Sequence, residues 1–218
     1  MTGPIVVINP NSNEAVTHGL DAALARFRLQ GGPNIDCLTL AEGPFGIESQ
    51  RDSDAVVLPL VKLMQARSDA SAFVIACYSD PGLDTCRSTV SQPVFGIQES
   101  GVLTALARGD RIGIIGISAA SERRHRLFMR RMGVLDRVAG ERALNMSVDD
   151  TARGSGTFDR LVEVGGALLD DGAEALVLGC AGMAAHRAAL ETTMNVPVID
   201  PTQAAVAMAM GTVLARPS

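Results

Sequence analysis

Short apolar runs alternate with segments of helical periodicity along nearly the whole chain. Each run is rich in Val, Ile and Leu and is bounded by Gly, Pro, Asn or Ser, a pattern typical of buried strands. The expected strands begin at Ile5, Ile35, Ala72, Pro93, Arg111, Val138, Glu174 and Val196. Helical spacing fills the intervals, most clearly over 14–27, 121–132 and 158–169. This alternation predicts β-α-β units with parallel strands and right-handed crossovers.

The eight expected strands fall into two sets of four with matching spacing. Three pairs of landmarks show nearly the same offset: 103 residues for Cys77 and Cys180, 104 for Pro93 and Pro197, and 107 for Ile5 and Ile112 (180 − 77, 197 − 93 and 112 − 5). Any α/β chain has roughly periodic strands, and that is the alternative explanation. We interpret the constant offset as two halves of the same topology, each contributing one sheet.

Two of the expected strands, "AFVIAC" and "EALVLGC", end on a cysteine. If the halves are equivalent, Cys77 and Cys180 occupy the same place, at the carboxyl end of the third strand of each half. Ligands bind at this edge of open parallel sheets. Two such edges facing each other bring two thiols towards one ligand from opposite sides.

Paired thiols have a specific chemistry. We expect both cysteines at helix N-termini, where the helix dipole and unpaired amides lower a thiol pKa and favour a basic thiolate. A neutral thiol on the opposite face can return a proton, as in a racemase or epimerase. Amides and hydroxyls of "CYSDPG", "GCAGM" and "GISAAS" are the expected donors to an enolate. The alternative is that both cysteines only pack in the core, the role expected for Cys37 and Cys86.

Composition excludes several classes of function. The chain has 218 residues, 47% hydrophobic and only 3% aromatic, so its core is aliphatic, and its net charge is −5. Its basic cluster, "SERRHRLFMRR", fits a solvated helix face better than a nucleic-acid surface. No apolar run approaches the ~18 residues of a membrane span. The N-terminus lacks the features of a secretory signal, and the four cysteines show no disulfide framework, so we expect a cytoplasmic protein with reduced thiols.

Other catalytic patterns are weak. His18, His125 and His186 lie in helical segments and are expected to have surface or helix-end roles, although a Cys–His hydrolase stays open. Ligand spacings for a metal and the GxGxxG of dinucleotide binding do not occur in the sequence. Pro59 is expected to kink or end a helix. The segment Ser147–Thr157 is the most loop-like, by default a surface loop and alternatively an active-site lid.

Six motifs resemble, in order and spacing, the hydantoin racemase branch of the Asp/Glu racemase superfamily. They are "VINPNSN", "GPFGIES", "ACYSDPG", "VFGIQESG", "RIGIIGIS" and "LGCAGMA". The resemblance implies two pseudo-symmetric α/β domains, each a mostly parallel four-stranded sheet flanked by helices, with the active site in the interdomain cleft. The C-terminal helix would pack back on the first domain, which gives domain limits of 1–97 with 205–218 and 98–204.

The resemblance also implies site residues. The family's two catalytic cysteines fall on Cys77 and Cys180. The implied substrate contacts are Asn11, Ile47, Ser79, Asp80, Ser118, Ala181 and Gly182. Such enzymes need no cofactor and no metal, act on a small molecule such as a cyclic ureide or a related carbon acid, and are typically homo-oligomers; no nucleic-acid or membrane partner is expected.

Departures from the wider superfamily narrow the prediction. Glutamate racemases carry a His two residues after the second cysteine, where this chain has Gly182, and we find no clear set of cationic groups for a free amino acid. Two cysteines argue against arylmalonate decarboxylase, whereas a maleate-type cis-trans isomerase stays open. We predict a racemase of 5-substituted hydantoins or allantoin. The alternatives are an Asp/Glu-type amino-acid racemase, the isomerase, a covalent cysteine hydrolase and a two-lobed binding protein.

Overall fold

Two four-stranded sheets of identical topology build the molecule. The computed structural model describes residues 3–153 and 156–215. The strand orders are β2-β1-β3-β4 and β6-β5-β7-β8, and every pair of neighbours is parallel. The strands are β1 (Ile5–Asn9), β2 (Ile35–Thr39), β3 (Ala72–Ile75), β4 (Val94–Gly96), β5 (Ile112–Gly116), β6 (Val138–Ala143), β7 (Ala175–Leu178) and β8 (Val198–Ile199). The predicted fold class and internal repeat are confirmed.

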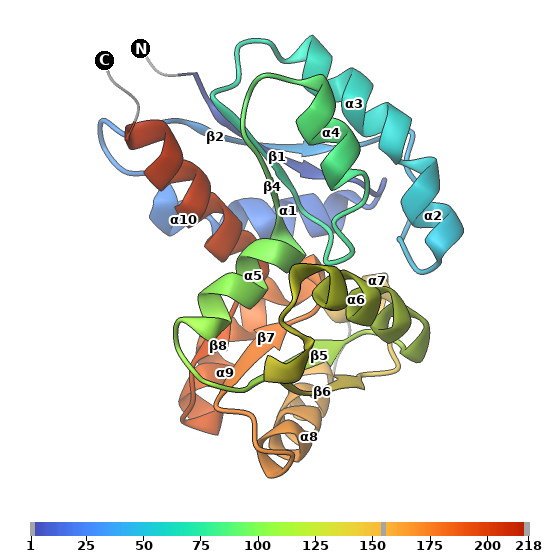
Figure 1. The fold of residues 1–218 in the computed structure, drawn as a ribbon. Coiled ribbons are helices and arrows are strands. Elements are labelled where there is room, and N and C mark those ends of the chain that lie inside the picture. The colour runs from blue at the N-terminus through green and yellow to red at the C-terminus, as the bar shows by residue number, and fades with distance from the viewer. Residues whose placement is uncertain (1–2, 154–155, 216–218) are drawn as a thin grey trace.

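Helices connect the strands within each half and carry the chain between the halves (Figure 1). The α-helices are α1 (Glu14–Ala23), α2 (Gln50–Ala55), α3 (Val57–Ala66), α4 (Leu83–Thr89), α5 (Ile97–Leu106), α6 (Ala119–Met132), α7 (Val148–Arg153), α8 (Thr157–Asp170), α9 (Arg187–Met194) and α10 (Pro201–Leu214). The 3₁₀ helices are η1 (Ala25–Phe27), η2 (Leu135–Arg137) and η3 (Ala181–His186). Pro59 was expected to kink or end a helix. The helical segment is indeed broken between α2 and α3, and Pro59 lies in the first turn of α3, where a proline is tolerated.

The first sheet is buried on both faces. Val6 and Ile8 of β1 pack in one hydrophobic cluster, whereas Ile5 and Val7, which point the other way, belong to a second cluster that continues into the second sheet. A strand buried on both faces reads as a continuous apolar run, which is why "IVVIN" shows no alternation. The shared cluster therefore holds the two sheets in one continuous core.

Helix α10 returns from the second sheet to the first. It packs against α5 and against β1, β3 and β4 (Figure 1). Its N-cap is Asp200, whose side chain accepts a 2.7 Å hydrogen bond from the N–H of Gln203. The predicted limit between 204 and 205 falls inside this continuous helix. The domain limits themselves stay a prediction.

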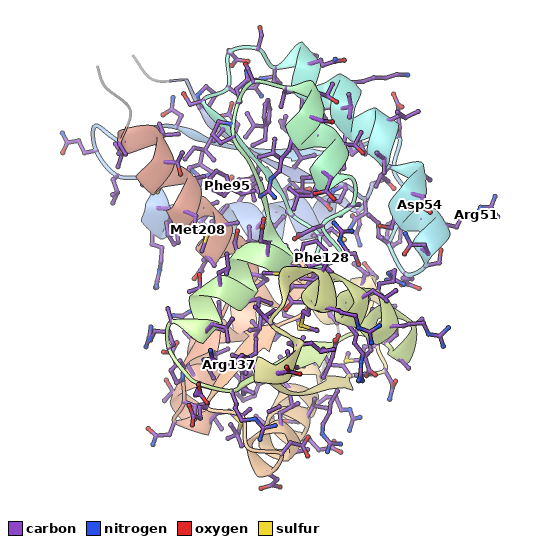
Figure 2. The ribbon with its side chains drawn as sticks, viewed as in Figure 1. Arg51, Asp54, Phe95, Phe128, Arg137 and Met208 are labelled. Carbon is purple, nitrogen blue, oxygen red and sulfur yellow. The ribbon has the colours of Figure 1, made fainter. Side chains whose placement is uncertain are left out.

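Helix α6 also contacts the first half. Phe128, at the boundary of the two halves in Figure 2, packs against the hydrophobic cluster of β1 and β3 that also includes Cys77. Arg131 and Asp84 form an exposed ion pair at 2.6 Å between α6 and α4. Because exposed pairs contribute little, Phe128 supplies more of this contact.

The expectation of a surface loop over Ser147–Thr157 was wrong for most of that segment. Residues 148–153 form α7, which packs against α1 and η3. Ser147 caps it: the N–H of Asp150 donates to the Ser147 hydroxyl, which in turn donates to the Asp150 carboxylate at 2.7 Å. The polar composition of the segment reflects this cap and not disorder. Residues 154 and 155 lie outside the described residues.

A buried carboxylate joins β3 to α5. Asp80 adopts a left-handed φ of 42° and accepts 2.8 Å hydrogen bonds from the N–H groups of Gln98 and Glu99 in the first turn of α5. Burial raises the pKa of Asp80 to about 7, although both N–H groups favour the charged form. A Cβ on Gly96 would come within 2.3 Å of this carboxylate. Gly96 is therefore required by the side chain of Asp80.

We expect Gly96→Ala to lower the free energy of unfolding by about 1–3 kcal/mol, because the methyl group displaces Asp80 from the start of α5. Urea denaturation followed by circular dichroism measures this. Gly166→Ala in α8 is the matched control, since its Cβ would meet no atom within 4 Å and the substitution favours a helix by up to about 1 kcal/mol. Equal midpoints for the two variants would contradict this role of Gly96.

Candidate active site

The two cysteines occupy equivalent positions in the two halves. Cys77 follows β3 by two residues and Cys180 follows β7 by two residues. The backbone just before each is fixed by the same bond to the first strand of its sheet: Ala76 N–H donates to the Ile8 carbonyl and Gly179 N–H to the Ile115 carbonyl, both at 2.8 Å. Strand pairing therefore places one thiol at the carboxyl edge of each sheet.

Both cysteines line a single cavity of about 30 Å³ between the halves. Four of the predicted substrate contacts also line it: Asn11, Ile47, Ser79 and Ala181. The residues that the sequence reasoning did not assign to it are Val16, Ala76, Ile117, Ser121, Arg124, His125, Val148 and Gly179, together with Tyr78, which was considered only as an aromatic candidate. The cavity has room for at least one water molecule.

The expectation of two helix N-termini was half right. Cys180 is the N-cap residue of the 3₁₀ helix η3. Cys77 instead lies in a turn closed by a 2.9 Å bond from the Asp80 N–H to the Cys77 carbonyl, and α4 begins only at Leu83. The Ser79 N–H donates to the Cys77 thiol and the Gly182 N–H to that of Cys180. Each thiol therefore receives one local backbone donor.

The expected lowering of the thiol pKa values was wrong. Burial raises the pKa of Cys77 to about 12 and also raises that of Cys180, and in both cases it outweighs the backbone donor. Removal of water disfavours the charged thiolate more than one N–H group favours it. Negative neighbours raise both pKa values further: Cys180 and Asp80 act on Cys77, and Asp200 and Glu48 act on Cys180. Arg124 acts in the opposite direction and lowers the pKa of Cys77.

Helix α7 brings a hydroxyl to Cys180. The Thr151 hydroxyl donates to the Val148 carbonyl at 2.8 Å, and its oxygen lies 3.7 Å from the Cys180 sulfur. Either group can be the donor in the second contact. The contact lowers the pKa of Cys180, but burial raises it by more.

Asn11 is oriented by a buried network after β1. Its Oδ1 accepts 3.0 Å bonds from Asn9 Nδ2 and from the backbone N–H of Asn13. Asn9 Nδ2 also donates to the Thr17 hydroxyl at 3.0 Å, and its Oδ1 accepts from the Asn11 N–H. With its oxygen occupied, the Asn11 amide has its NH₂ group left for the cavity. The turn "NPNSN" thus presents a hydrogen-bond donor to a ligand.

A family model for Asp/Glu/hydantoin racemases matches residues 5–209. The chain belongs to this family. It is 31% identical over 212 residues to the hydantoin racemase of Paenarthrobacter aurescens, and the match covers 94% of this chain and 89% of that one. It is 33% identical over 209 residues to the hydantoin racemase of Pseudomonas sp. strain NS671, and that match covers 94% of this chain and 84% of the other. The structure of the allantoin racemase from Klebsiella pneumoniae matches with a TM-score of 0.91 and 30% identity over 97% of this chain and 88% of that one. The protein is a racemase, and hence an isomerase, and the expected resemblance is confirmed.

Three predicted contacts of the racemase lie outside the cavity lining. Asp80 binds the start of α5. Ser118 is the N-cap of α6 and accepts from the Ser121 N–H, and it is Ser121 that lines the cavity. Gly182 lies so close to α7 that a Cβ would meet the Thr151 hydroxyl at 2.9 Å. These residues shape the walls, and their contact with substrate stays a prediction.

The basic cluster of the sequence is not a uniformly solvated face. His125 is 2% exposed, its Nδ1 lies 2.5 Å from Glu141 Oε1, and its ring meets the edge of the Tyr78 ring at 4.9 Å. The surface role expected for His125 was therefore wrong. Ser121, His125 and Met129 are all buried at a spacing of four residues, the helical signal that the flanking arginines obscured. Phe45, an aromatic candidate for the pocket, is 58% exposed and does not line it.

Metal and membrane association were also considered. Among the residues that the structure describes, no group of three His, Cys, Asp or Glu side chains is placed to hold a metal ion. Within the same ranges, no helix is long and apolar enough to cross a membrane.

The raised pKa of Cys77 predicts its reactivity. The pKa is about 12. At any pH below that value, each increase of one pH unit therefore raises the thiolate fraction about tenfold. We expect the rate of alkylation of Cys77 by iodoacetamide to rise about tenfold per unit between about pH 7 and about pH 10, as measured by peptide mass spectrometry. Cys77→Ser identifies the peptide. A rate that levels off near neutral pH would show instead that the thiolate is stabilised.

Proposed function

We propose that this racemase interconverts the enantiomers of 5-substituted hydantoins, or of allantoin, by a two-base proton transfer that uses no cofactor. The observation that carries the proposal is the position of Cys77 and Cys180 at equivalent sheet edges around one cavity. The similarity to hydantoin racemases and to an allantoin racemase supports the substrate class.

The reaction needs one base and one acid on opposite faces of the α-carbon, which is C5 of the ring. One cysteine thiolate removes the proton, and the electron pair of the C–H bond moves to the neighbouring carbonyl as an enolate. The opposite thiol gives its proton to the other face of C5. After one turnover the first cysteine is a thiol and the second is a thiolate, ready for the opposite enantiomer.

Neighbouring charges act on both thiols. Arg124 lowers the pKa of Cys77 while Cys180 and Asp80 raise it, and Asp200 and Glu48 raise the pKa of Cys180. Burial keeps both cysteines mainly as thiols in the free enzyme, so the base is the minor thiolate form. A thiolate formed in a dehydrated site is a strong base, because burial raises its pKa to about 12 and thereby brings it nearer to that of a carbon acid.

The remaining roles follow from the walls of the cavity. Asn11 and Ser79 would bind ring carbonyls and N–H groups, and Ile47 and Ala181 would exclude water from the enolate. Asp80, Ser118 and Gly182 would act through the backbone that they fix. Assembly into a homo-oligomer and a cytoplasmic location stay predictions.

The cysteine pair is tested with single enantiomers of a 5-substituted hydantoin in D₂O. We expect Cys77→Ser and Cys180→Ser each to lower racemisation by at least about 10³-fold. Each variant keeps one base, so each should still exchange the α-proton of one enantiomer, and of opposite enantiomers. Polarimetry and ¹H NMR measure the two rates. Cys37→Ser, in β2, should behave as wild type.

Two outcomes would contradict the two-base proposal. One is racemisation by both cysteine variants at the wild-type rate, after the spontaneous exchange has been subtracted. The other is a wild type that leaves hydantoins and allantoin unchanged but isomerises an alkene diacid, which would favour the maleate-type reaction.

Asn11 tests the orientation of the ring. Asn11→Asp keeps the oxygen that accepts from Asn9 and Asn13 but replaces the NH₂ donor by a second oxygen, which repels a substrate carbonyl. We expect kcat/KM to fall about 10–100-fold. Asn195→Asp, an exposed substitution at the end of α9, should leave it unchanged. An equal kcat/KM for both variants would remove Asn11 from substrate binding.

A further inference from the structure

Several of the backbone donors expected to hold the enolate already have acceptors. The Ser79 and Gly182 N–H groups donate to the two thiols. The Asp80 N–H donates to the Cys77 carbonyl at 2.9 Å, and the Met183 N–H donates to the Cys180 carbonyl at 3.2 Å. The N–H of Ser121 is bound by Ser118. A side-chain donor without an acceptor is therefore a further candidate to meet the developing negative charge on the substrate oxygen.

Arg124 is such a group. It stands on α6 and lines the cavity together with both cysteines. Its Nη1 donates to the carbonyls of Glu48 at 3.1 Å and Ala120 at 3.3 Å. Its Nε and Nη2 are buried and have no hydrogen-bond partner among the residues that the structure describes. A buried cationic donor without an acceptor is costly, and a native protein keeps one where it has a functional partner.

We propose that Arg124 is a further catalytic residue of this racemase, whose free N–H groups stabilise the enolate oxygen formed from the ring carbonyl next to the α-carbon. The inference rests on the proposed function and adds to it the electrophile that the two-cysteine scheme lacks. It also gives the substrate class a requirement: a carbonyl oxygen must lie on the α6 side of the α-carbon.

The guanidinium suits this step because it carries charge without exchanging protons. When a thiolate takes the α-proton, the C–H electron pair moves to the carbonyl oxygen, and the Arg124 N–H···O bonds become charge-assisted. When the opposite thiol returns a proton to carbon, the electron pair returns with it. The charge of Arg124 stays in place throughout, because a guanidinium group is not deprotonated in proteins. It therefore adds no third proton donor to the site.

The tether of Arg124 makes the site preorganised. Its bond to the Glu48 carbonyl joins α6 in the second half to the loop of the first half that also carries Ile47, a cavity residue. The guanidinium is thus held at the boundary of the halves before substrate arrives. Its charge also faces the Cys77 thiol and favours the thiolate there. One cation serves the base and the enolate in the same step.

The test compares wild type with Arg124→Gln and Arg124→Lys on a 5-substituted hydantoin with an uncharged side chain. We expect Arg124→Gln to lower kcat for racemisation and for α-proton exchange by about 10²–10³-fold, with KM changed less than about threefold, because the interaction forms in the transition state. Arg124→Lys keeps the charge and should lose about tenfold. Arg123→Gln, an exposed neighbour on the same helix, is the matched control and should keep wild-type kcat.

A chemical rescue separates catalysis from a structural role. Guanidinium chloride at millimolar concentration should raise the kcat of Arg124→Ala at least about tenfold, whereas sodium chloride at the same ionic strength should not. Thermal melting of each variant checks the fold. A purely structural Arg124 would give lowered melting, raised KM and no rescue, and this result would overturn the proposal.

The outcomes also separate this inference from the proposed function. If the wild type racemises hydantoins and Arg124→Gln keeps its kcat within about threefold, the role of Arg124 is wrong and the two-cysteine reaction stands. If the wild type racemises neither hydantoins nor allantoin, the proposed function fails and the inference fails with it.

Discussion

Removal of water from two thiols is the constraint on which the site depends. Cys77 and Cys180 line one cavity of about 30 Å³, and burial is the largest influence on the pKa of both. A charge in such a space costs several kcal/mol unless it is paired. The local N–H group at each sulfur offsets only part of that cost. The charged groups around the cavity, among them Arg124, Asp80 and Asp200, therefore act on which thiol can be charged.

The symmetry of the fold and the asymmetry of the charges have different origins. Identical strand orders and equivalent backbone bonds at Ala76 and Gly179 place the thiols alike. Their surroundings come from unrelated helices: α6 carries Arg124 towards Cys77, and α7 carries Thr151 towards Cys180. A racemase needs equivalent geometry on both faces of the α-carbon, yet it needs unequal proton occupancy to begin. The duplicated sheets provide the first, and the different side chains that α6 and α7 bring to the two thiols provide the second.

Hydrogen bonds join the elements around the cavity. Arg124 binds the Glu48 carbonyl, Gln98 binds the His125 carbonyl at 3.2 Å, and Asn13 binds Asp149 at 2.9 Å. These contacts join the loop of the first half, the start of α5 and the turn after β1 to α6 and α7. Each such hydrogen bond contributes about 1 kcal/mol net. The hydrophobic cluster that the two sheets share joins the halves as well.

The sequence by itself determined the strands, the internal repeat and the two cysteines, because these depend on local periodicity and on the order of elements along the chain. The run "FVIAC" and its counterpart "LVLGC" predict buried strands wherever they pack, and parallel pairing then places the residues after each strand at one edge of its sheet. The motif resemblance added Asn11, Ile47, Ser79 and Ala181, which line the cavity.

The pKa direction of the cysteines was missed, because it depends on how much water the other half excludes. The roles of Arg124, His125 and α7 were missed because the sequence does not distinguish a polar helical residue that faces water from one that faces another part of the protein. Only the tertiary structure decided that Glu141 meets His125, Asp80 meets α5 and Thr151 meets Cys180, since each of these pairs joins residues far apart in the sequence that packing alone brings together.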